Sequence, residues 1–167
     1  MPMLTESLRH EHWQFANPIE TIEETAAAVD EMPVTELRDR IDATYSFLVE
    51  QFIPHANAEV RVEWVIDAPH ATATMVREHV EVTRLAQKLL ALRERLVYAY
   101  FGPGQLRALQ ETLYDLHAIL VLHRSKEDGI YLPLLDARIS AEGIEKVEAV
   151  HATAKRASAV EAAGAGS

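Results

Sequence analysis

The sequence contains no cysteine among its 167 residues. This absence excludes disulfides, thiolate zinc sites, iron–sulfur clusters and cysteine nucleophiles together. Any metal ion in this protein must therefore be held by nitrogen and oxygen atoms. Aromatic residues are also scarce, at 7% of the chain. Ala, Leu, Val and Glu dominate the composition instead, which favours helices over strands.

Basic residues are few, and long hydrophobic runs are absent. Sixteen Lys and Arg stand against 26 Asp and Glu, for a formal net charge of −10, which argues against nonspecific binding of nucleic acid or of an anionic membrane. No apolar run approaches membrane-spanning length, and the N-terminus lacks the basic and apolar regions of a signal peptide. We expect a soluble, cytoplasmic protein whose partners include neither nucleic acid nor a membrane.

The spacing of apolar residues predicts an all-α protein. Four long amphipathic helices are expected at about 5–29, 34–66, 71–98 and 105–139, with a shorter helix at about 140–160. Short links between long helices predict an up-down-up-down four-helix bundle with a short C-terminal helix or tail. We assign residues 1–160 to one domain and expect residues 161–167 to be disordered. Pro54 and Pro133 lie inside predicted helices, where each should cause a kink.

A pattern of histidine and acid occurs twice in the chain. A histidine is followed four residues later by a glutamate, and a Glu-His step precedes each such pair. Corresponding positions of the two copies are 67 or 68 residues apart. Residues four apart share one helix face, so each pair offers a nitrogen and a carboxylate to one point. The candidate metal ligands from the two copies are His12, His55, Glu59, His79, His123 and Glu127.

The predicted inner stripe of each long helix carries one of these four histidines. Burying four imidazoles and two carboxylates without partners would be costly. A pair of metal ions would satisfy them, and imidazole with carboxylate suits iron, manganese or zinc. Two carboxylates placed between two cations can bridge them. The repeat therefore predicts one two-metal centre with pseudo-twofold symmetry.

Four segments of the chain resemble the hemerythrin-like (HHE cation-binding) domains of the bacterial type. They are Leu-Arg-His-Glu-His12, Ile-Pro-His55-Ala-Asn-Ala-Glu59, Arg-Glu-His79-Val-Glu-Val and Leu-His123-Arg-Ser-Lys-Glu127-Asp-Gly-Ile-Tyr-Leu-Pro. The resemblance covers roughly residues 5–140 and implies two non-haem iron ions. In that family's arrangement, His12 and His55 would serve one iron and His79 and His123 the other. Glu59 and Glu127 would bridge them, together with an oxo or hydroxo group.

The chain departs from the oxygen-carrying members of that family at two positions, and from many other relatives at a third. Met75 stands where those proteins have a further histidine, and their fourth-helix carboxylate would correspond to Asp128. Val60 stands where many relatives have an acid after the glutamate. Fewer ligands imply a more open iron position, so we expect oxidation by oxygen and reaction with peroxide or nitric oxide rather than stable oxygen carriage.

Several further residues lie near the candidate ligands in the sequence. We expect Glu11 and Glu78 to be solvated helix acids, and Met75 and Tyr131 to be packing residues. Whether Asp128, Tyr131, Glu63 or His10 enters the metal site stays open. His117 is expected to be a polar or interface residue, and His70 and His151 have no assignable partner.

The sequence thus predicts a non-haem diiron protein that binds or reacts with O2, peroxide or nitric oxide in redox or stress handling. An apolar lining from Phe15, Phe52, Ile119 and Leu120 would favour a small neutral ligand. One alternative is an iron- or oxygen-sensing module without turnover, in which metal binding contributes to folding. A second alternative is a metal-free helical interaction protein. Enzymatic activity, as a peroxide- or nitric oxide-reactive oxidoreductase, stays open.

Overall fold

The structure is a computed structural model, and it describes residues 5–66, 69–96, 102–138, 149–150, 152–153 and 155–157. Within these ranges the side chains of 5, 62–72 and 138 are not described. The described part is helical throughout apart from short turns, and it contains no strand. The all-α prediction is therefore confirmed for these residues. The expected tail at 161–167 and most of the expected helix at 140–160 lie outside them.

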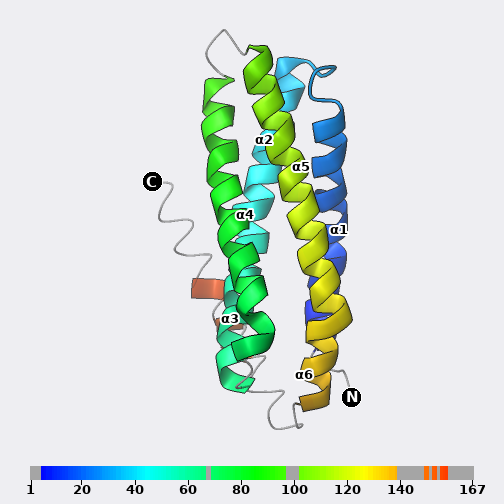
Figure 1. Cartoon of the computed structure of the whole chain (residues 1–167), viewed down its shortest axis with the longest axis vertical. Helices are drawn as coiled ribbons and strands as arrows, with labels where there is room; N and C mark the ends of the chain where they lie inside the picture. The colour runs from blue at the N-terminus through cyan, green and yellow to red at the C-terminus, as the bar shows by residue number, and fades with distance from the viewer. Residues whose placement is uncertain are drawn as a thin grey trace.

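Four long helical rods lie alongside one another (Figure 1). The elements are α1 (Thr5–Ala27), α2 (Val34–Phe47), η1 (Leu48–Phe52), α3 (Ile53–Ile66), α4 (Pro69–Arg95), α5 (Pro103–Lys126), η2 (Glu127–Tyr131) and α6 (Leu132–Arg138). The second rod joins α2, η1 and α3, and the fourth joins α5, η2 and α6. Contacts run from α1 to α5, α5 to α4, α4 to α2 and α3, and α2 to α1. This closed ring of neighbours is compatible with the expected four-helix bundle.

Two of the three rods with an internal proline include a π-helical turn, whereas α1, which contains Pro18, stays α-helical. η1 ends two residues before Pro54, and η2 ends two residues before Pro133. The N–H of Ile53 bonds the carbonyl of Leu48, five residues back. A proline lacks an N–H and crowds the carbonyl of the preceding turn, and a wider turn relieves this crowding. The expected disturbance is therefore present as a local widening.

Helix α5 begins two residues earlier than the sequence pattern suggested. Pro103 occupies its first turn, where the missing N–H has no cost because that donor would have no helical partner. The side-chain oxygen of Gln105 accepts a hydrogen bond from the backbone N–H of Gly102 at 3.0 Å. This cap explains why the link expected before residue 105 already contains the start of the helix.

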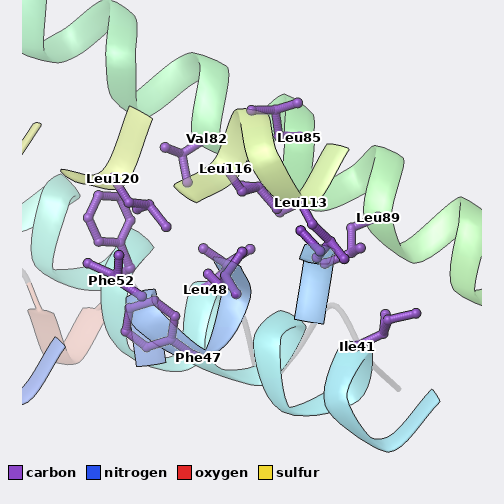
Figure 2. Packing of buried hydrophobic residues seen from close by; sticks show 14 of the residues in the cluster. Ile41, Phe47, Leu48, Phe52, Val82, Leu85, Leu89, Leu113, Leu116 and Leu120 are labelled. Atoms are coloured by element: carbon purple, nitrogen blue, oxygen red, sulfur yellow. The ribbon is translucent and has the colours of Figure 1, made fainter. Parts of the chain in front are cut away.

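Two apolar clusters of different size fill the space between the rods. The large cluster extends from Phe15 and Phe52 to the far end of the rods, and Figure 2 shows part of its packing, including Leu48, Leu116 and Leu120. The small cluster consists of Leu8, Met75, Tyr131, Leu132 and Leu135. Along α1, α4 and the fourth rod, the histidines fall between residues of one cluster and residues of the other. The candidate ligands therefore form a polar layer between two dry regions.

Candidate metal centre

Six buried polar side chains converge in this layer, each from a position where the helix faces the interior. They are His12 from α1, His55 and Glu59 from α3, His79 from α4, His123 from α5 and Glu127 from η2. The most exposed of them is His79, at 7%. Their donor atoms form two groups of four, each with atoms within 4.8 Å of one another, and both groups share Glu59 and Glu127. The structure thus brings together all six candidate ligands, in groups that could hold a metal ion.

The four imidazoles are arranged as two facing pairs. In the first histidine pair, Nε2 of His12 lies 3.1 Å from Nε2 of His55. In the second, Nε2 of His79 lies 3.1 Å from Nε2 of His123. Two nitrogens bound about 2.1 Å from one ion, at nearly a right angle, lie about 3 Å apart. Each pair is therefore spaced as two ligands of one ion would be.

Each glutamate directs one oxygen toward each histidine pair. Oε1 of Glu59 lies 3.2 Å from Nε2 of His55, whereas Oε2 lies 4.0 Å from Nε2 of His79. Oε2 of Glu127 lies 3.1 Å from Nε2 of His12 in the first pair. Its Oε1 lies 2.7 Å from Nε2 of His123 in the second pair. Both carboxylates therefore span the gap between the pairs, as carboxylates that bridge two cations would.

Three of the four imidazoles donate a hydrogen bond from Nδ1, the nitrogen away from the other ligands, to a carboxylate. Nδ1 of His12 donates to Asp128 at 2.9 Å, and Nδ1 of His55 donates to Glu11 at 2.9 Å. Nδ1 of His123 donates to Glu78 at 3.0 Å. The prediction that Glu11 and Glu78 are solvated helix acids is therefore wrong. Each one lies on the helix side that meets the neighbouring rod, a placement that sequence spacing within one helix does not show.

These contacts determine which ring nitrogen carries the proton. An ionised carboxylate only accepts hydrogen bonds, so Nδ1 of His12 and of His55 must each carry a hydrogen. The lone pairs of the two Nε2 atoms in the first pair then point toward each other and toward Glu59 and Glu127. Protons or cations between these atoms would remove the repulsion. While the facing Nε2 atoms carry no proton, Oε1 and Oε2 of Glu59 and Oε1 of Glu127 are buried without a hydrogen-bond donor. Buried polar atoms are rarely left in this way, and the donor set fits a pair of cations.

A lysine contacts each of the two carboxylates that precede a histidine. Nζ of Lys155 lies 2.7 Å from Oε2 of Glu11, and Lys126 hydrogen bonds Glu78. Burial of Glu11 opposes its ionisation, but the hydrogen bonds from His55 and Lys155 lower its pKa to about 2. Glu11 is thus an anion throughout the neutral range. It can orient the imidazole of His55 and strengthen its Nε2 as a ligand.

In the metal-free chain, protons compensate the negative charge of the layer. Burial, followed by the charge of Glu127, raises the pKa of Glu59 well above its usual range. Burial raises the pKa of Glu127 less than its hydrogen bonds to His12 and His123 lower it, so this group stays ionised. Burial lowers the pKa of His12 and of His123, but the hydrogen bonds to Glu127 and its charge outweigh burial. The pKa of each of these two histidines is therefore raised above 6.5. Burial and the charge of His123 lower the pKa of His79 to about 3.

These directions lead to a prediction about pH. Metal binding should release protons from Glu59, His12 and His123, so affinity should rise with pH between about 5 and 8. Above about pH 6.5, where the lowered pKa of His79 no longer affects stability, the metal-free protein should show the opposite trend. A raised folded-state pKa stabilises the fold below the unfolded value, 6.5 for the histidines, and this contribution is lost as pH rises through the folded value. Calorimetric titration in buffers of different ionisation enthalpy measures the protons released. An affinity that does not change with pH contradicts the prediction.

Aromatic rings close one side of the layer. The ring of Phe15 lies 5.1 Å from that of His55, and the ring of Phe52 lies 5.5 Å from that of His123. Both phenylalanines and Leu120 are buried, and Ile119 is partly buried against the same cluster. Phe15 and Phe52 therefore provide part of the expected apolar lining, and Leu120 and Ile119 belong to the cluster behind these rings.

The remaining histidines and candidate residues lie outside the layer or outside the described side chains. His10 is exposed, stacks on Trp13 and contacts Gln14. His117 is half-buried and lies 3.5 Å from Glu23. Met75 and Tyr131 pack in the small cluster, as expected. The side chains of His70 and Glu63, and residue His151, lie outside the described part.

No described helix is long and apolar enough to cross a membrane. Comparison of the chain with protein-family models, with curated proteins and with solved structures finds no match. The functional assignment therefore depends on the geometry of the six residues and of the carboxylates behind them.

Proposed function

We propose that this chain is a hemerythrin-like protein that holds two non-haem iron ions and binds or reacts with O2, peroxide or nitric oxide. The observation that carries the proposal is the division of each glutamate between the two histidine pairs. A single ion would need only one pair and would leave the other pair facing itself without a cation. The pseudo-twofold repeat of the sequence accounts for both halves.

The donor set narrows the choice of metal. Imidazole nitrogens and carboxylate oxygens without sulfur suit iron, manganese and zinc. Bound iron would supply a redox-active centre with room for a small exogenous ligand. The residues of the chain hold this centre, orient its ligands through Asp128, Glu11 and Glu78, and exclude water through Phe15 and Phe52.

Met75 bears on the reactivity of this centre. It lies one helical turn before His79 and packs in the small apolar cluster at 3% exposure. An apolar thioether there gives the second histidine pair no additional nitrogen. We therefore infer that the reduced protein is oxidised by oxygen or peroxide rather than forming a long-lived oxygen adduct.

A sensing role is the second candidate, and one contact favours it. Lys155, near the end of the chain, contacts Glu11, which orients His55. A change in the metal centre could thus alter the contact between Lys155 and Glu11. In this reading the iron centre reports iron or oxygen and does not turn over peroxide.

The test is metal analysis followed by spectroscopy of the purified protein. Expression in iron-replete medium should yield about two iron ions per chain, and the absorption spectrum should change on reduction and on addition of air, peroxide or nitric oxide. Repeated turnover of peroxide supports the reactive protein, and a single spectral change without turnover supports the sensor. A fully helical protein that binds no metal would refute both and leave the helical interaction protein.

A further inference from the structure

The two halves of the candidate metal centre differ in one respect. His12, His55 and His123 each donate from Nδ1 to a carboxylate. Nδ1 of His79 is buried and has no hydrogen-bond partner. This imidazole, at 7% exposure, is therefore the one ligand of the four whose ring is not oriented from behind.

The repeat in the sequence explains the missing partner. Asp128 follows Glu127 and accepts from His12 in the first pair. The corresponding position after Glu59, 68 residues earlier, is Val60. A valine side chain cannot accept a hydrogen bond. Glu11 and Glu78 do not make the two halves differ, because Glu11 accepts from His55 in the first pair and Glu78 accepts from His123 in the second.

A hollow borders the half that lacks the carboxylate. Its volume is about 350 Å³, and it lies between α3 and α4. Its lining includes His79, Val60, Arg61 and Thr83. By contrast, the first pair is covered by the ring of Phe15 and by Asp128. The second half therefore has both a less oriented ligand and an open space next to that ligand.

We propose that the two metal positions are inequivalent, and that the position at His79 and His123 is the weaker and exchangeable one. This inference rests on the proposed metal centre. A carboxylate that accepts a hydrogen bond from one nitrogen of a ligating imidazole fixes the tautomer of the ring and makes the other nitrogen a stronger ligand. Loss of such a carboxylate lowers metal affinity about 10–100-fold. The position at His12 and His55 should fill first and release its ion last.

Zinc is a suitable probe because it is diamagnetic and binds the same donor atoms. The metal-free full-length chain is titrated with Zn²⁺ while NMR follows the ring nitrogens of the individual histidines. The first equivalent should shift the signals of His12 and His55, and the second those of His79 and His123. Competition with a chelator should give two dissociation constants that differ about 10–100-fold.

Exchange of the two repeat positions provides the matched variants. Val60→Asp should strengthen the second position, and Asp128→Val should weaken the first, each about 10–100-fold. The double variant should reverse the order of filling. Val80→Asp is the control, because Val80 lines the same hollow but is exposed and does not occupy the repeat position.

The outcomes separate this inference from the proposed function. Two ions that bind with one affinity, or a second half that fills first, would overturn the inequivalence while leaving the metal centre intact. An equal gain from Val80→Asp would assign the effect to charge and overturn the role of the repeat position. A wild-type chain that binds no zinc and no iron would remove the metal centre itself, and the inference with it.

Discussion

Replacement of Glu59 or Glu127 by alanine is expected to reduce bound metal from two ions per chain to one or none. Each of these carboxylates faces both histidine pairs, so removing either one would take an oxygen ligand from both proposed metal positions. It also removes negative charge that offsets the repulsion between two cations. Elemental analysis of purified variants, with helicity checked by circular dichroism, measures the effect.

Asp128→Ala provides the contrasting variant. Asp128 lies beside Nδ1 of His12, on the side away from the other ligands, and should therefore affect orientation rather than coordination. We expect this variant to keep two ions at high metal concentration and to lose about 10–100-fold in affinity at the first position. Glu20→Ala, at an exposed site on α1, is the control for the loss of a helix carboxylate. If Asp128→Ala loses metal while Glu127→Ala keeps it, Asp128 is the ligand and our assignment of Glu127 is wrong.

Removal of metal is expected to destabilise the protein strongly. A ligand present at about 1,000 times its dissociation constant stabilises the fold by about 4 kcal/mol. For a chain of this size, that corresponds to a fall in the melting temperature of about 8–16 °C when the metal is removed. Thermal unfolding with iron and after chelation, followed by circular dichroism, tests this expectation.

The variant Glu59→Leu should increase the stability of the metal-free protein, whereas most mutations in a protein core decrease stability. In the metal-free protein it removes a buried carboxyl group whose pKa is raised by burial and by the charge of Glu127. Burying a polar group whose hydrogen bonding is incomplete costs about 1–3 kcal/mol, and a leucine at this position avoids that cost. We expect the metal-free variant to be more stable than the metal-free wild type, although it should no longer bind two ions. Glu20→Leu is the exposed control.

A different result would favour the metal-free alternative. If chelation leaves the melting temperature unchanged and Glu59→Leu destabilises the protein, the six polar residues satisfy one another without a cation. The layer would then be a structural polar network, and the helical interaction protein would be the better interpretation.

If the two metal positions are inequivalent, they should also differ in reactivity. An exchangeable ion at His79 and His123 would lie next to the hollow and would be the position reached first by a small ligand. The two ions would then have different tasks, one mainly structural and one open to exchange.

The sequence by itself determined the local features of this protein. Helices could be predicted because apolar residues recur at a spacing that a single helix imposes. The pairs His55–Glu59 and His123–Glu127 could be predicted for the same reason, since residues four apart share a face. The internal repeat linked the two pairs without any knowledge of their neighbours. Four of the six candidate ligands depend on this short-range rule, and His12 and His79 were added by the repeat and by their places on the apolar stripes.

The tertiary structure alone decided which residues support those ligands. Glu11 reaches His55 across 44 residues of sequence, and Asp128 reaches His12 across 116. Such partners depend on how neighbouring rods are rotated and on the π-helical turns before Pro54 and Pro133, which periodicity does not reveal. The same is true of His79, since its unpartnered nitrogen becomes evident only when Val60 and the hollow between α3 and α4 are seen beside it. Short-range spacing selects the ligands, whereas long-range packing decides how firmly each one is held.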